Sequence, residues 1–215
     1  MHSTRRSILA GLGAGGLAVA GVARPVAAQS ARPEGSAFRP VQPPVPTEAP
    51  AGKVEVIEFF WYGCPHCNAL EPAVKAWARQ LPPDVAFRKV HVPWQVQAHQ
   101  QLFYTLDALG KADELGDRVF AAIHTDRQRL DTPEAMADLL ARHGVDRKQF
   151  LDAYSSFGVR AKVQRATQLA AAYKVDGVPM FGVAGRWVTA PSMAGSNAEA
   201  LKVVDALVDR ARKGG

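Results

Sequence analysis

The residues with the clearest chemical potential are Cys64 and Cys67, the only two cysteines of the 215-residue chain, which enclose Pro65 and His66. An apolar run typical of a buried strand, residues 54–60, precedes them, and apolar side chains at helical spacing follow. Cys64 is therefore expected at the start of a helix, where unpaired backbone N–H groups and the helix dipole stabilise a thiolate. Cys67 lies on the same helix face within bonding reach. The pattern predicts a redox-active disulfide with a reactive first thiol.

Two other uses of a cysteine pair fit less well. A structural disulfide gains most when it closes a long loop, and this pair would close a very short one. A structural zinc ion needs four Cys or His ligands, but the chain has no second cysteine pair. Its other histidines show no ligand spacing; they are His2, His91, His99, His124 and His143. We therefore expect neither a metal ion nor a cofactor.

Residues 1–28 have the composition of a cleavable export signal. Arg5 and Arg6 precede a short Gly/Ala/Leu/Val stretch, and Val26 and Ala28 fit the small-residue rule for cleavage before Gln29. The paired arginines fit a twin-arginine signal, and an ordinary Sec signal fits almost equally well. The apolar stretch is short and glycine-rich, which argues against a permanent membrane span. We expect a soluble protein of the bacterial periplasm, an oxidising compartment in which the cysteine pair can rest as a disulfide.

The charge of the chain gives no reason to expect a nucleic-acid partner. The formal net charge is +6, but the signal carries three arginines and no acidic residue, so +3 remains after its removal. A charge of this size is ordinary for a soluble domain.

The rest of the chain divides by composition. Residues 29–52 contain six prolines and few large apolar side chains, and we interpret them as an extended, poorly ordered linker. About 160 residues remain, enough for one well-buried domain. Within them, residues 85–92 favour a second strand, and helical spacing then runs from residue 95 to 173. Residues 180–183 and 186–189 predict a hairpin, and residues 197–210 predict a closing amphipathic helix.

Several of these features together resemble the DsbA family of periplasmic thiol:disulfide oxidoreductases. They are the segment Glu58–Cys67 (EFFWYGCPHC), the helical stretch after the second strand, Ser156-Phe157, and Gly177-Val178-Pro179. The resemblance covers residues 50–211. It implies an α/β thioredoxin-like fold with an inserted helical domain: residues 53–94 and 158–211 form the thioredoxin-like domain, and residues 95–157 form the insertion.

The resemblance also implies roles for the cysteine motif. Cys64 matches the exposed nucleophile, whose sulfur a substrate thiolate attacks to form a mixed disulfide, and Cys67 matches its buried partner. Between them, Pro65 and His66 complete the catalytic motif. A histidine in this position can stabilise the Cys64 thiolate by charge or by hydrogen bonding, which makes the disulfide a stronger oxidant.

Two further sites follow from the same resemblance. Val178-Pro179 matches a cis-proline loop that faces the cysteines and offers the backbone of Val178 to an extended substrate peptide. Glu58 matches a buried acid that helps to move protons near the inner cysteine. The alternative for Glu58 is a strand residue that points to solvent or pairs with Lys89.

The sequence therefore predicts a monomeric periplasmic dithiol oxidase that donates its Cys64–Cys67 disulfide to reduced exported polypeptides. A membrane quinone-linked partner of the DsbB type would reoxidise it. One alternative is a periplasmic disulfide isomerase or reductase, although residues 29–52 are too few for the dimerisation domain of an isomerase. Another is a non-catalytic chaperone or assembly factor.

Overall fold

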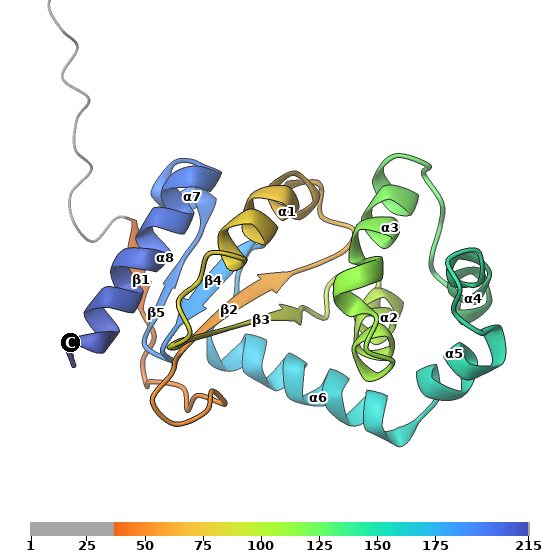
Figure 1. Ribbon diagram of the computed structural model, residues 1–215, viewed down its shortest axis with the longest axis horizontal. Helices are drawn as coiled ribbons and strands as arrows, with labels where there is room; N and C mark the ends of the chain where they lie inside the picture. The colour runs from red at the N-terminus through yellow and green to blue at the C-terminus, as the bar shows by residue number, and fades with distance from the viewer. Residues whose placement is uncertain (1–36, 215) are drawn as a thin grey trace, which may run out of the picture. The chain divides into compact units, whose positions relative to one another are not determined.

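The computed structural model describes residues 37–214, so the expected export signal lies outside the described residues. A five-stranded mixed sheet has the order β1-β5-β4-β2-β3 (Figure 1). Its central strand β2 (Val54–Phe60) pairs in parallel with β3 (Val85–His91) and antiparallel with β4 (Met180–Val183). Strand β5 (Trp187–Thr189) pairs antiparallel with β4. The sheet thus has β2, which leads into the cysteine motif, near its centre.

Helix α1 (Pro65–Ala78) makes the crossover between the parallel strands β2 and β3. It shares one face of the sheet with α8 (Asn197–Arg212), as Figure 1 shows. The apolar side chains of these two helices, among them Leu70, Val74 and Val204, pack against buried residues of β2, β4 and β5. This packing fixes the helix that carries the cysteines against the sheet.

The segment between β3 and β4 is helical throughout. It contains α2 (Gln97–Ala108), α3 (Ala112–His124), α4 (Pro133–Ala141), α5 (Arg147–Tyr154) and α6 (Phe157–Ala172). Helices α2 to α5 lie together beyond the β3 side of the sheet, and the long α6 leads back beneath it (Figure 1). The fold is therefore the expected thioredoxin-like α/β fold with an inserted helical domain, for which we keep residues 95–157 as the proposed bounds.

Local signals set several helix starts. Thr132 caps α4 by accepting the backbone N–H of Ala135, and Pro133 occupies the first helical position. Asp146 caps α5 by accepting the N–H of Gln149 at 2.7 Å.

The proline-rich segment differs from our expectation. Its described part, residues 37–52, is not a poorly ordered linker, because β1 (Phe38–Pro40) pairs antiparallel with β5 at the edge of the sheet. Val41 is buried in the main core, and the backbone N–H of Val45 donates to the carbonyl of Gly185 at 2.8 Å. Proline is compatible with an edge strand, which leaves one side of its backbone unpaired. This proline-rich segment therefore forms an ordered edge of the domain.

Helix α7 (Pro191–Ala194), a single turn that follows β5, was not among the predicted elements. Among the described helices, none is long and apolar enough to cross a membrane.

Candidate active site

The cysteine motif begins where β2 has ended and α1 starts. The backbone N–H of Cys64 donates to the carbonyl of Trp61 at 3.0 Å, which closes a turn between strand and helix. Cys64 is the N-cap residue of α1, and its sulfur accepts the backbone N–H of Cys67 at 3.4 Å. Pro65 stands at the first helical position, where no N–H is needed. The expected placement of Cys64 at a helix N-terminus is confirmed.

This environment makes Cys64 acidic. Its pKa falls from the ordinary value of 9.0 to about 6, mainly because the side chain of Cys67 hydrogen-bonds to its sulfur. The backbone N–H groups of Cys67 and His66 and the charge of His66 lower the pKa further, while burial opposes the shift. The thiolate is therefore a stabilised leaving group and a stabilised product of disulfide reduction.

His66 has a smaller share in this effect than the sequence suggested. Its side chain is exposed, and its charge is the weakest of the causes that lower the pKa of Cys64. The backbone N–H of His66 lowers the pKa of Cys64 more than its imidazole does. An exposed charge is screened by water, whereas the buried hydrogen bonds from Cys67 are not.

Cys67 has the opposite character. It is 1% exposed, against 6% for Cys64, so the expected order of accessibility holds, but Cys64 is less exposed than we expected. The hydrogen bond to Cys64 and burial raise the pKa of Cys67, and the negative charge of Glu58 adds to this effect. Both cysteines are free thiols in this structure. The pair thus combines one acidic thiol near the surface with one buried thiol that holds its proton.

Glu58 is completely buried on β2 and lies opposite Lys89 in the register of β2 and β3. Its pKa is raised from 4.5 to about 7, mainly by burial; the charge of Lys89 opposes the rise, and the charge of Glu71 adds to it. The ammonium nitrogen of Lys89 lies 3.4 Å from Oε2 of Glu58. Apart from this contact with Lys89, neither carboxylate oxygen of Glu58 has a hydrogen-bond partner in the described part of the chain. The solvent-facing alternative for Glu58 is wrong, and the pairing with Lys89 is present. A carboxyl group that titrates near neutral pH can exchange a proton with the buried thiol.

Glu71 completes this charged cluster, and sequence reasoning missed it. It follows Cys67 by four residues on α1 and hydrogen-bonds to Lys89. Burial lowers the pKa of Lys89, but the charges of Glu58 and Glu71 outweigh burial and raise it. The four-residue spacing was the available signal, since it puts Glu71 on the same helix face as Cys67.

The Val178-Pro179 peptide bond is cis, as expected, and its loop lies against the cysteine motif. The Cys64 thiol donates to the carbonyl oxygen of Val178 at 3.5 Å. Because this contact covers one side of the sulfur, it accounts for part of the low exposure of Cys64.

A cavity of about 540 Å³ opens beside this loop. Its wall includes Arg39 from β1, His66, Val178, Pro179, Pro191 and Met193. The residues from β1 and α7 were not predicted, because neither element was expected in the fold. The lining mixes apolar and polar residues, and one of them, Val178, contacts the Cys64 sulfur through its carbonyl oxygen. Such a surface suits weak binding of unfolded polypeptide.

Known proteins are similar to this chain in sequence and in fold. The family of DSBA-like thioredoxin domains matches residues 86–201. The thiol:disulfide interchange protein DsbA of Bordetella parapertussis is 48% identical over 176 residues, which cover 80% of this chain and 83% of the relative. The protein of the same name from Burkholderia cepacia is 41% identical over 211 residues, which cover 97% and 96% of the two chains.

Solved structures agree with these relatives. The crystal structure of Pseudomonas aeruginosa DsbA matches with a TM-score of 0.80 and 40% identity, covering 83% of this chain and 93% of that one. Reduced DsbA1 from Neisseria meningitidis matches with a TM-score of 0.74 and 29% identity, covering 86% and 97%. The chain therefore belongs to the DsbA family and is a protein dithiol:disulfide oxidoreductase that acts in disulfide formation.

Proposed function

We propose that the Cys64–Cys67 pair is the redox centre and donates its disulfide to reduced exported polypeptides in the bacterial periplasm. The observation that carries this proposal is the asymmetry of the two thiols: the pKa of Cys64 is lowered to about 6, while the pKa of the more deeply buried Cys67 is raised. A dithiol whose reduced form is stabilised as a thiolate is an oxidant as a disulfide.

The reaction proceeds by two exchanges. A substrate thiolate attacks the sulfur of Cys64, so that a substrate–Cys64 disulfide forms and the Cys64–Cys67 bond breaks with Cys67 as the leaving thiolate. A second substrate thiolate then attacks the substrate sulfur of this mixed disulfide and expels Cys64 as a thiolate. The substrate dithiol has lost two electrons and two protons. The two electrons reduce the enzyme disulfide, one proton ends on Cys67, and the other goes to solvent because Cys64 remains a thiolate.

Cys67 leaves as a buried thiolate and must gain a proton. We assign Glu58 to this step because its pKa of about 7 lets it hold a proton at neutral pH, and its charge acts on Cys67. Lys89 and Glu71 are positioning residues that set the charge around Glu58.

Val178 and Pro179 bind the substrate in this proposal. The backbone of Val178 pairs with an extended substrate segment, which the 3.5 Å contact between its carbonyl and Cys64 would bring to the sulfur. His66 and Pro65 complete the motif, His66 as a donor of its backbone N–H to the Cys64 thiolate.

Turnover requires reoxidation. We assign it to a DsbB-type membrane quinone-linked oxidase, and we expect the enzyme to act as a monomer after export by the twin-arginine or Sec route. Residues 53–94 and 158–211 are our proposed bounds for the thioredoxin-like domain.

The proposal is tested by mixing the oxidised protein with a reduced model peptide that contains two cysteines. Wild type should convert about one equivalent of peptide dithiol to disulfide, and Cys64→Ser and Cys67→Ser should convert none. Peptide oxidation by the Cys64→Ser variant at the wild-type rate would refute the proposal.

A further inference from the structure

Both backbone groups of Tyr62 are held by histidine side chains. The N–H of Tyr62 donates to Nε2 of His91 at 3.1 Å, and the carbonyl of Tyr62 lies 2.8 Å from Nε2 of His124. Because a carbonyl oxygen only accepts, Nε2 of His124 must carry the proton. Nε2 of His91 must accept, so its Nδ1 carries the proton and donates to the carbonyl of Val92 at 2.9 Å. We call these two hydrogen bonds to Tyr62 the histidine clamp.

The two histidines come from different parts of the fold. His91 is the last residue of β3 and is completely buried. His124 is the last residue of α3, in the helical insertion, and its ring stacks on Phe120 with 6.0 Å between ring centroids. Tyr62 lies between β2 and α1. The clamp therefore joins the insertion directly to the segment that leads into the cysteine motif.

Peptide geometry links the clamp to Cys64. The N–H of Tyr62 and the carbonyl of Trp61 belong to one planar peptide unit, so a bond that fixes one also fixes the direction of the other. His91 holds that N–H, and the carbonyl of Trp61 accepts the N–H of Cys64 at 3.0 Å. His124 holds the next peptide unit, between Tyr62 and Gly63.

The same segment also acts on Cys67. A hydrogen bond from the backbone of Trp61 lowers the pKa of Cys67, against the larger effects of Cys64 and burial, which raise it. Gly63 adds a packing constraint, because a Cβ atom there would overlap the indole ring of Trp61. The backbone of Trp61 therefore acts on both cysteines, through the N–H of Cys64 and through the sulfur of Cys67.

We propose that His124 is a positioning residue of the redox site: from the end of α3 it holds the Tyr62 carbonyl opposite His91 and orients the turn that presents Cys64 and Cys67. The inference rests on the proposed roles of the two cysteines. Its consequence is that a hydrogen bond from the insertion tunes the oxidising strength of the thioredoxin-like domain.

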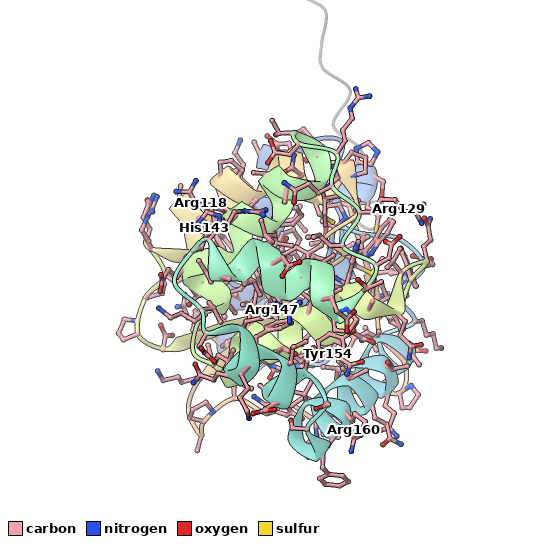
Figure 2. The ribbon with its side chains drawn as sticks, turned by 90° about the vertical axis from the view of Figure 1, so that its right-hand side faces the viewer. Arg118, Arg129, His143, Arg147, Tyr154 and Arg160 are labelled. Atoms are coloured by element: carbon pink, nitrogen blue, oxygen red, sulfur yellow. The ribbon has the colours of Figure 1, made fainter. Side chains whose placement is uncertain are left out.

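The test compares two substitutions of His124 with one control. His124→Leu removes the donor, and His124→Gln keeps an N–H donor of similar reach. His143→Leu is the control, since Figure 2 shows His143 on the outer face of the insertion. Each protein is equilibrated with glutathione buffers, the pH midpoint of Cys64 alkylation is measured, and oxidised and reduced forms are melted separately.

We expect His124→Leu to shift the equilibrium with glutathione about fivefold toward the protein disulfide, the ratio that one ordinary hydrogen bond supplies. The alkylation midpoint of Cys64 should rise in parallel. His124→Gln should lie close to wild type, and His143→Leu should equal it. A purely structural role for His124 would lower both melting temperatures equally and leave the equilibrium constant unchanged.

The inference is overturned if His124→Leu keeps the wild-type equilibrium constant, or if the Gln variant behaves like the Leu variant. Should His124→Leu not fold, ¹⁵N NMR of the wild-type histidines decides. We expect an Nε2-protonated His124 whose resonance differs between the oxidised and reduced forms, and an identical resonance in both forms would overturn the inference. Peptide oxidation by wild type distinguishes a failure of this inference from a failure of the proposed function. If wild type does not oxidise the peptide, the proposed function is wrong, whatever the His124 variants show.

Discussion

The thiol of Cys64 and the carbonyl oxygen of Val178 lie 3.5 Å apart, although the two residues are separated by 114 positions in the sequence. The contact sets the nucleophile at a helix N-terminus against the loop of the cis peptide Val178-Pro179. A polypeptide segment paired with the backbone of this loop would pass directly over the sulfur. Sequence-independent binding through the backbone suits an enzyme whose substrates share only a pair of thiols.

Cys64 should be alkylated by iodoacetamide with a midpoint near pH 6 in the reduced, folded protein, because its hydrogen bonds from Cys67 stabilise the thiolate. Cys67 should stay largely unmodified, since it is buried and its pKa is raised. Mass spectrometry of peptides after a timed reaction at pH 5 to 8 checks this. The unfolded protein is the control, in which both thiols should react with the same midpoint, well above that of Cys64 in the folded protein. Equal labelling of the two cysteines in the folded protein would contradict the assigned roles.

Cys67→Ala, with Cys64 first converted by oxidised glutathione to a Cys64–glutathione disulfide, should exchange the glutathione for a reduced polypeptide and retain it as a mixed disulfide, because no internal thiol can displace the substrate from Cys64. The substitution also removes the side chain that contributes most to the low pKa of Cys64, so we expect that pKa to rise. Trapping is therefore best measured at pH 8, on non-reducing gels. Cys64→Ala is the matched control and should trap little. Similar amounts of adduct from the two variants would show that the nucleophile is wrongly assigned.

Replacing His66 should weaken the oxidant, and the two natural choices should differ. His66→Ser removes only the charge of the side chain, whereas His66→Pro also removes the backbone N–H that lowers the pKa of Cys64 more strongly. Each unit by which the thiolate pKa rises should lower the reduction potential by about 30 mV. We expect the Pro variant to have the lower potential of the two. Potentials equal to wild type in both variants would refute a role for His66.

Glu58 should make stability depend on pH in a defined direction. Its pKa is raised from 4.5 to about 7 by burial, so the folded state binds the proton more tightly than the unfolded state. The stability it contributes is fully present below pH 4.5 and is lost as the pH rises through about 7. The loss is on the order of 3 kcal/mol.

Glu58→Gln, which cannot ionise, should remove this dependence. Urea melts of the reduced proteins at pH 4 and pH 8 measure the effect. The free energy of unfolding of the variant should increase relative to that of wild type as the pH rises. This relative increase should be absent at pH 4. A wild type whose stability is flat between these two values, or parallel to that of the variant, would contradict a raised pKa for Glu58.

Much of the fold was predictable because its signals are local. The apolar run of β2, the turn into α1, the caps at Thr132 and Asp146, and the hairpin of β4 and β5 depend on residues close together in sequence. The cysteine motif was placed correctly for the same reason, since Cys64 and Cys67 lie within one helical turn.

Features that depend on distant partners were missed. Strand β1 is three residues long and ends in Pro40, so only its pairing with β5 identifies it as a strand. The spacing of Glu71 from Cys67 places it on the same helix face, but its pairing with Lys89 depends on the packing of α1 against β3. His66 lowers the pKa of Cys64 less than Cys67 does. This order also depends on burial, which the spacing of residues along the sequence does not encode.

The most direct test of the central claim is a redox titration of the Cys64–Cys67 pair against glutathione, read out by alkylation and mass shift. We expect a potential more oxidising than about −200 mV, because the folded environment stabilises the Cys64 thiolate of the reduced form. A potential of about −270 mV, in the range of thioredoxin, would contradict the claim and identify the protein as a reductant.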